Sequence, residues 1–233
     1  MIAREGLPFI AGGTLITLVL LLLSARFDSR IIVSLAAVAA LLTVFTTFFF
    51  RDPDRSFVSE PGIIVAPADG KVIGIEQIAE HPFIGGAATN ISIFLSVFDV
   101  HINRIPATGR IDYVRYQPGK FFVAFEDKAS EFNEHTEIGM TTDTGARSVF
   151  KQIAGLIARR IVCRVREGES VTAGQRFGLI RFGSRTELFV PAESRLSLHI
   201  GDYVAGGETV LGYLPRTEEE QTEVQQIRGT DGD

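Results

Sequence analysis

Hydrophobic and polar positions divide this chain into an apolar first part and a longer part in which short apolar runs alternate with glycine and polar residues. Residues 6–25 and 31–50 contain no charged residue, and neither run has the one-sided apolar stripe of a surface helix. Each run is about long enough to cross a ~30 Å hydrocarbon core as a helix. The pattern therefore predicts a membrane anchor at 1–50, built from two apolar helices over 7–25 and 31–50.

A cleaved secretory signal is the alternative for the first apolar run, because Arg4 precedes it. The run is long for a signal, and a second apolar run follows at once, which favours an anchor. Arg4, Arg51 and Arg55 flank the two runs, whereas Arg26 and Arg30 lie in the short loop between them. With the N-terminal amine added, this distribution favours both termini on the cytoplasmic side of the membrane.

Beyond residue 51 the pattern is typical of β-structure, with short runs of β-branched and aromatic residues bounded by glycine. Residues 148–163 also favour one or two strands, although 150–160 would fit a helix. The fold class predicted is mainly β with few helices, as a β-rich domain over 51–214 that follows the helical pair. The other strands are predicted over 63–65, 71–75, 90–98, 110–116 and 121–125.

An internal repeat marks the last third of this domain. Residues 168–174 (GESVTAG) recur 33 positions later as 201–207 (GDYVAGG). The glycines permit positive φ in tight turns, and the valine between them can pack inward. This G-x-x-V-x-x-G turn resembles the repeats of lipoyl- and biotinyl-type β-sandwiches, and it predicts a lipoyl- or barrel-sandwich-like β core.

The net charge of −5 is concentrated at the C-terminus, where 216–233 contain six acidic and two basic residues. The sequence therefore predicts an acidic, mobile tail at 215–233. No basic block with interleaved aromatic residues is present, so nucleic acid is not an expected partner. Cys163 is the only cysteine, and no histidine pair has metal-ligand spacing, so neither a disulfide nor a metal is expected.

Three short motifs could carry chemistry. Pro67-Ala68-Asp69-Gly70 places a carboxylate before a predicted strand, although Pro-x-Asp-Gly is also a turn sequence on its own merits. His101 lies in 96–106 (SVFDVHINRIP), where a structural histidine is the simpler interpretation. Gly183-Ser184 lies in 179–185 (LIRFGSR), and a lone Gly-Ser pair is a common turn. Each motif is weak alone, so any functional interpretation rests on their combination.

In this order, the motifs resemble those of phosphatidylserine decarboxylase proenzymes of the short bacterial type. The resemblance runs from about residue 50 to 214, and its further elements are FRDPDR at 50–55, Asn133-Glu134, Gly145-Ala146 and Phe182 before the Gly-Ser pair. It implies a precursor that cuts its own chain between Gly183 and Ser184. The two pieces, 1–183 and 184–233, would stay associated.

The family chemistry assigns a role to each motif. The Ser184 hydroxyl would attack the Gly183 carbonyl, and elimination and hydrolysis would then leave a covalent, self-generated pyruvoyl group at position 184. His101 would be the base, with Asp69 as its orienting carboxylate. The amine of phosphatidylserine would form a Schiff base with the pyruvoyl group, and carbon dioxide would leave. Protonation by His101 and hydrolysis would release phosphatidylethanolamine.

One position departs from the family pattern. Longer members carry two histidines in this segment, three positions apart, and the second belongs to the self-cleavage triad. His101 matches the first, and Arg104 stands where the second would be. Either His101 serves both self-cleavage and decarboxylation, or another group replaces the missing base.

The resemblance also defines the expected partners and location. These are a phospholipid substrate, the membrane, the two pieces of the precursor and a second copy in a homodimer. An anchor suits a lipid substrate that stays in the bilayer. We therefore expect the protein in the inner membrane, with its catalytic domain on the cytoplasmic face.

A different class of protein fits part of the sequence. Asp127-Lys128-Ala129 resembles the lysine turn of lipoyl domains, and the G-x-x-V-x-x-G repeat fits the same fold. The alternative is therefore a membrane-tethered carrier or adaptor module without catalysis. About forty residues separate Lys128 from Gly168, more than one small hairpin sandwich would use. The two hypotheses differ at Ser184, which only the enzyme converts.

Overall fold

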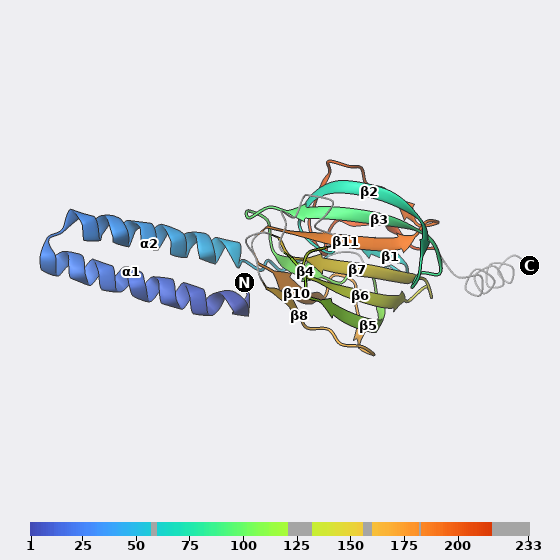
Figure 1. The fold of residues 1–233 in the computed structure, drawn as a ribbon, viewed down its shortest axis with the longest axis horizontal. Helices are drawn as coiled ribbons and strands as arrows, with labels where there is room; N and C mark the ends of the chain where they lie inside the picture. Colours follow the sequence, from blue (N-terminus) through green and yellow to red (C-terminus); the bar gives the residue numbers. More distant parts are fainter. Residues whose placement is uncertain (57–59, 121–131, 156–159, 182, 216–233) are drawn as a thin grey trace, which may run out of the picture. The chain divides into compact units, whose positions relative to one another are not determined.

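The computed structural model describes residues 1–56, 60–120, 132–155, 160–181 and 183–215 (Figure 1). Within it the chain forms two compact units, Met1–Asp54 and Arg55–Asp233. The strand predicted at 121–125, Lys128 and the acidic tail from residue 216 onward lie outside the described residues.

The first unit is a pair of helices, as predicted. After a short 3-10 turn, η1 (Arg4–Gly6), come α1 (Leu7–Phe27) and α2 (Arg30–Phe49). Asp28, with φ of 44°, ends α1 in the left-handed conformation that makes the tight turn possible. Both helices are long and apolar enough to cross a membrane.

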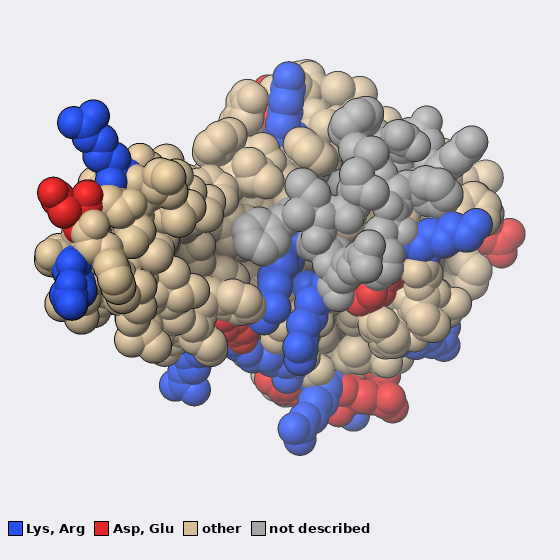
Figure 2. Space-filling view, turned by 60° about the vertical axis from the view of Figure 1, so that its left-hand side comes forward, with Lys and Arg blue, Asp and Glu red and all other residues tan. Residues whose placement is uncertain are grey.

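The surface of this unit is apolar almost throughout. Leucine, isoleucine, valine and phenylalanine side chains along both helices are exposed. Residues 6–25 and 31–50 carry no charge, and most of the surface of the pair is uncharged in Figure 2. Hydroxyl groups on the helices donate to carbonyls of their own helix, as Thr17 does to Gly13 and Thr47 does to Thr43. Such internal pairing is what a helix surrounded by lipid requires.

The second unit is mainly β, which confirms the predicted class. Its large sheet is curled and antiparallel, with the strand order β13-β2-β3-β11-β7-β6-β5-β9 (Figure 1). These strands are β2 (Gly70–His81), β3 (Gly86–Leu95), β5 (Gly109–Gln117), β6 (His135–Thr142), β7 (Arg147–Ile153), β9 (Ser170–Val171), β11 (Ser184–Pro191) and β13 (Tyr203–Val204).

Two three-stranded sheets complete the domain, in the orders β1-β14-β12 and β4-β10-β8. Strands β7 and β8 confirm the preference for strands over a helix within 148–163. The members of these sheets are β1 (Ile63–Val65), β4 (Ile102–Arg104), β8 (Ile161–Cys163), β10 (Arg176–Ile180), β12 (Arg195–Leu196) and β14 (Val210–Tyr213).

The sequence repeat occupies equivalent places in this architecture. One copy contains β9 and the other contains β13, and these two short strands form the opposite edges of the large sheet. The next strand after each copy, β10 or β14, is the central strand of a small sheet. The repeated valines, Val171 and Val204, are buried in the core. The repeat is thus a structural device that closes both ends of the large sheet.

The hydrophobic core lies against one face of the large sheet. On β11, Leu188 and Val190 face this core, whereas Arg185 and Glu187 alternate to the opposite face and form a buried ion pair of 3.0 Å. On β7, Phe150 faces the core. Because Ser184 lies an even number of residues from Leu188, it belongs to the core-facing side of β11.

Candidate active site

Ser184 is the first residue of the central strand β11 and pairs with Leu95 at the end of β3. It is fully buried, and its hydroxyl oxygen has no hydrogen-bond partner among the described residues. A buried hydroxyl without a partner costs free energy, about 1–3 kcal/mol. Such a group needs an explanation, and a nucleophile held ready for reaction is one.

Gly183, the residue before it, has a φ of +62°. This is the left-handed region, which costs a residue with a side chain roughly 1–2 kcal/mol. A Cβ built on Gly183 would meet no atom within 4 Å. The glycine is therefore required by the backbone conformation at the bond before Ser184, and not by lack of space.

His101 lies immediately before β4 and is buried. Its Nδ1 is 2.9 Å from the carbonyl oxygen of Asp99, and its Nε2 is 3.4 Å from the amide nitrogen of Gly183. One tautomer satisfies both contacts: Nδ1–H donates to Asp99, and the lone pair of Nε2 accepts from Gly183. The basic nitrogen of His101 thus faces the residue whose carbonyl Ser184 would attack.

A tight turn holds the carbonyl that orients this ring. The carboxylate of Asp99 accepts hydrogen bonds from the amide and the hydroxyl of Ser96, at 2.8 and 2.7 Å. This turn also explains why β3 ends at Leu95 and not at Phe98, as the sequence had predicted.

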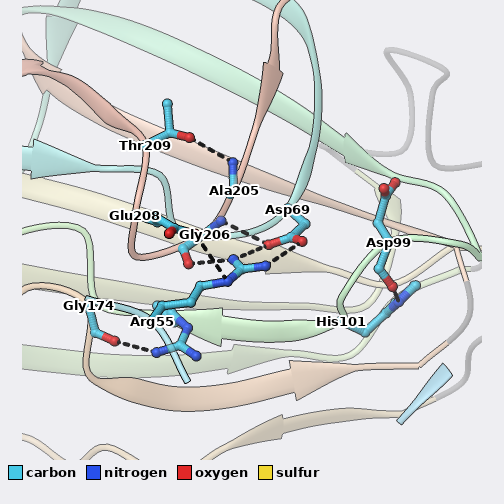
Figure 3. A network of polar contacts seen from close by, with 10 residues as sticks. Arg55, Asp69, Asp99, His101, Gly174, Ala205, Gly206, Glu208 and Thr209 are labelled. Atoms are coloured by element: carbon cyan, nitrogen blue, oxygen red, sulfur yellow. Dashed lines mark hydrogen bonds and ion pairs between the residues drawn. The ribbon is translucent and has the colours of Figure 1, made fainter. Parts of the chain in front are cut away.

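Asp69 lies at a different polar cluster (Figure 3). Arg55 binds both of its carboxylate oxygens, at 2.5 and 2.8 Å, and the amide of Gly206 donates to it at 2.9 Å. Arg55 also donates to the carbonyl of Gly206 at 2.7 Å and lies 3.6 Å from Glu208. We call Arg55, Asp69, Gly206 and Glu208 the Asp69 cluster.

The expected contact between Asp69 and His101 is not among the hydrogen bonds of the described residues. In Figure 3 the Asp69 carboxylate points toward Arg55, and the His101 ring lies apart from it with its nitrogen toward Asp99. The structure thus brings His101 to the Gly183-Ser184 bond and gives Asp69 other partners. The role of Asp69 in the chemistry stays a prediction.

Arg104, at the position of the missing second histidine, is buried and points to the first copy of the repeat. Its guanidinium donates to the carbonyl of Gly174 at 3.0 Å, and its amide donates to the carbonyl of Pro67 at 2.8 Å. The second contact holds the turn that carries Asp69 beside β4.

Sequence reasoning missed three polar residues in this region. Asn103, Gln152 and Thr186 are buried, and each has a side-chain atom without a partner in the described part of the chain. The sequence carried no clear signal for them, because polar residues also occupy other core-facing positions of these strands, such as Ser148 on β7.

A charged group on the opposite face of the large sheet is fully paired. Lys151 binds Glu137 at 2.9 Å, and the hydroxyl of Tyr113 donates to Glu137 at 2.9 Å. Burial by itself raises the pKa of Glu137, but Lys151 and Tyr113 outweigh it and hold that pKa below its ordinary value. The same burial and the Glu137 charge raise the pKa of Tyr113.

In the described ranges, no group of three or more histidine, cysteine, aspartate and glutamate side chains is placed to hold a metal ion.

Comparison with known proteins identifies the family. A family model described as phosphatidylserine decarboxylase matches residues 42–212. The chain is 46% identical over 213 residues to a phosphatidylserine decarboxylase proenzyme of Desulfotalea psychrophila, covering 91% of this chain and 96% of the relative. It is 47% identical to the proenzyme of Symbiobacterium thermophilum, covering 93% and 97%, and 46% identical to that of Chlorobium phaeobacteroides, covering 87% and 96%.

The matched region includes every motif singled out above, from the Asp69 turn to the Gly183-Ser184 pair. The similarity covers nearly the whole length of each relative and is not confined to a shared module. The chain belongs to the phosphatidylserine decarboxylase family of pyruvoyl-dependent carboxy-lyases.

Proposed function

We propose that this protein converts phosphatidylserine to phosphatidylethanolamine after cutting its own chain between Gly183 and Ser184. The observation that carries the proposal is the arrangement at this bond. A buried serine hydroxyl, without a partner among the described residues, follows a glycine in the left-handed conformation, and the Nε2 atom of His101 lies 3.4 Å from the amide of that glycine.

Self-cleavage begins with attack of the Ser184 oxygen on the Gly183 carbonyl carbon. The C–N bond of the peptide breaks as an ester C–O bond forms, and the hydroxyl proton goes to a base. Elimination across Cα–Cβ of residue 184 then releases the Gly183 carboxylate and leaves a dehydroalanine. Its hydrolysis consumes one water, releases one ammonia and leaves a pyruvoyl group on the 184–233 piece.

His101 is the base that the geometry offers. Its Nδ1–H is held by a backbone carbonyl, so the basic nitrogen is Nε2, which faces Gly183 and can take the Ser184 proton once its contact with the Gly183 amide is exchanged. The contact between His101 and the Gly183 amide changes when the peptide bond between Gly183 and Ser184 breaks. His101 then lies next to position 184. There it can donate a proton to the substrate carbon after carbon dioxide has left.

The surroundings of position 184 fit a pyruvoyl group, because Ser184 is buried and its hydroxyl has no hydrogen-bond partner in the described chain. A pyruvoyl group there supplies the electron-withdrawing carbonyl that reacts with the substrate amine and accepts the electrons of the leaving carboxylate. The residues around it exclude water and supply the proton.

Asp69 enters the proposal through its position. Both of its carboxylate oxygens are occupied, and they tie the Arg55 segment to the turn before β14. Its influence on His101, expected from the family pattern, would then pass through the Pro67 carbonyl that receives the Arg104 amide.

The same architecture supports the expected association of the two pieces. The smaller piece would begin with β11, which pairs with β3 along eight residues and with β7 on its other side. Removing it would expose the centre of the large sheet. The proposal also includes a membrane anchor formed by the helical pair of 1–54. It places the protein in the inner membrane with the β domain on the cytoplasmic side. A lipoyl-like arrangement of the core and a homodimer complete it.

Intact-mass measurement of the full-length protein tests the proposal. We expect two pieces, and the smaller one, 184–233, should be blocked by a pyruvoyl group in place of a free amine. A single chain of 25.5 kDa with an ordinary Ser184 would overturn it. Modification of Lys128 on an uncut chain would favour the carrier alternative.

A further inference from the structure

A layer of unpaired polar atoms lies on the core-facing side of the large sheet, next to position 184. It consists of the Ser184 and Thr186 hydroxyls, the Gln152 carbonyl oxygen and the Asn103 amide nitrogen. All four atoms are buried, and none has a hydrogen-bond partner in the described chain. We call Asn103, Gln152 and Thr186 the polar layer.

Strand register brings the polar layer to the reacting residue. Thr186 follows Ser184 by two positions on β11, so both side chains share one face and their Cα atoms are about 7 Å apart. Gln152 of β7 lies directly opposite Thr186. Asn103, two positions after His101 in the chain, lies 2.8 Å from Gln152 through its side-chain oxygen.

The orientation of the two amide groups is fixed by a backbone carbonyl. Gln152 Nε2 lies 3.3 Å from the carbonyl oxygen of Val162, which can only accept, so Nε2 must be the donor there. The Asn103 oxygen then accepts from the same Nε2. This arrangement leaves the Asn103 NH₂ as an unused donor and the Gln152 oxygen as an unused acceptor.

A glycine makes room for this arrangement. Gly178 of β10 pairs with Asn103, and a Cβ built on it would lie 2.7 Å from Gln152 Nε2 and 2.3 Å from the Val162 carbonyl. Any side chain at this position would displace the Gln152 amide. The β10 strand thus lacks a side chain at the point where the polar layer meets it.

Unsatisfied buried groups are costly, at about 1–3 kcal/mol each, and proteins keep few of them. Here donors and acceptors gather beside one reactive residue, which is the pattern expected when a ligand supplies the missing partners. The ligand must then present both an acceptor and an N–H donor close to position 184. The amino-acid part of a serine head group has both, as a carboxylate and an amine.

We infer, on the basis of the proposed function, that Asn103, Gln152 and Thr186 bind the amino-acid part of the substrate head group. The Asn103 NH₂ donates to the substrate carboxylate, and the Gln152 oxygen accepts from the substrate amine. The Thr186 hydroxyl adds a further contact beside position 184. Self-cleavage breaks the bond that joins Gly183 to residue 184, and this allows the head group to reach the layer.

The inference explains how substrate and product would be distinguished. Loss of carbon dioxide removes the carboxylate, so the product can no longer accept from Asn103 and leaves this donor unpaired again. A site built to hydrogen-bond a group discriminates strongly against ligands that lack it. The polar layer would therefore favour substrate over product.

The test uses two variants of the full-length protein, Thr186→Val and Asn103→Ala. Thr186→Val keeps the shape of the side chain and removes only the hydroxyl. For each protein three quantities are measured: the masses of the two pieces, the amount of reactive carbonyl trapped by phenylhydrazine, and kcat and KM on phosphatidylserine in mixed micelles. Inhibition by phosphatidylethanolamine is measured alongside.

We expect both variants to cut themselves and to carry wild-type amounts of reactive carbonyl. Their kcat/KM should fall roughly ten- to a hundredfold, the loss expected for one or two hydrogen bonds to a charged or polar group. Inhibition by phosphatidylethanolamine should be the same in Asn103→Ala as in the wild type, because the product has no carboxylate. A merely structural defect would weaken substrate and product alike.

Ser148→Ala is the matched control. Its hydroxyl is also buried on the same face of β7 and has no partner among the described residues, but it lies four residues from Gln152, about 13 Å along the strand. It should leave kcat/KM unchanged.

The inference is overturned if the two variants carry full carbonyl and match Ser148→Ala in kcat/KM, or if Asn103→Ala loses substrate and product affinity equally. If only Asn103→Ala fails to cut itself, the kcat/KM of Thr186→Val decides whether the polar layer binds the substrate. A wild-type protein that neither cuts itself nor traps phenylhydrazine contradicts the proposed function itself, which separates the two failures.

Discussion

Two polar clusters in the β domain, one half-buried around Asp69 and one buried around Ser184, differ in how well they are paired. In the Asp69 cluster, the carboxylate receives three hydrogen bonds from Arg55 and Gly206. Around Ser184, the hydroxyl and the nearest atoms of the polar layer have no partner in the described chain. Hydrogen-bonded polar groups stabilise a fold, whereas buried polar groups without partners destabilise it. We therefore propose a chemical task for the region around Ser184, and we expect the Asp69 cluster to act on stability, while the predicted role of Asp69 in the chemistry stays a prediction.

The largest effect is expected from Ser184→Ala, which removes the nucleophile from the unpaired region. We expect no cleavage and no decarboxylation, because neither the ester nor the pyruvoyl group can form. Intact mass and release of carbon dioxide measure the two outcomes. Ser148→Ala, which removes another unpaired buried hydroxyl of the same sheet, should cut normally; cleavage of Ser184→Ala at position 183 would contradict the mechanism.

His101→Ala should slow self-cleavage by about 10²- to 10⁴-fold, the usual contribution of a general base. The time course of fragment formation after synthesis of the precursor measures this rate. His135 is a close control, because its Nδ1 also contacts a carbonyl two residues earlier, that of Asn133 at 2.8 Å. His135→Ala should cut at the wild-type rate. Normal cleavage by His101→Ala would remove His101 from this step.

Asp69→Asn should act mainly on stability, because it removes the carboxylate that binds the half-buried Arg55 guanidinium through both oxygens, and the other carboxylate of the cluster, Glu208, is 3.6 Å away. Losing hydrogen bonds between charged groups costs about 1–3 kcal/mol, and Arg55→Gln should cost a similar amount. Both losses of stability are measured by denaturant unfolding of proteins that also carry Ser184→Ala and therefore remain uncut. If Asp69→Asn slowed cleavage far more than an equally destabilised Arg55→Gln, the carboxylate would have a direct role at His101.

The Glu137 group gives the smallest effect and extends the comparison to a second paired region. The folded-state pKa of Glu137 is below its ordinary value of about 4.5. The Glu137 carboxylate therefore contributes fully to the free energy of unfolding above this ordinary value, and the contribution is lost as the pH falls through the lower folded-state pKa. Glu137→Gln should lower the free energy of unfolding at pH 7 by about 1–3 kcal/mol.

The difference between wild type and Glu137→Gln should shrink as the pH is lowered from 5 to 3, measured by denaturant unfolding at each pH. Tyr113→Phe is the control, since it keeps the Lys151–Glu137 pair and removes one neutral donor. A difference that grows toward acid pH would contradict the direction of the pKa shift.

The sequence by itself determined the helical pair and the β class, and it predicted the residues of the cleavage site. Runs of about twenty apolar residues allow few structures besides a membrane-length helix, and alternation bounded by glycine indicates strands. The repeated G-x-x-V-x-x-G turns and the Gly183-Ser184 pair are likewise local features, because their backbone demands are set by adjacent residues. His101 was found for the same reason, through its place in one continuous motif.

Only the tertiary structure decided which of these residues meet. The partners of Asp69 come from 55 and 206, far from it in the chain, so its pairing with Arg55 could not be predicted from a local pattern. Asn103, Gln152 and Thr186 were invisible for a related reason. Each is an ordinary polar residue in its own strand, and only strand register and the missing side chain at Gly178 place their unpaired atoms beside residue 184. Hydrogen bonds between side chains of different strands depend on how distant segments pack in the tertiary structure, and the local sequence pattern does not specify this packing.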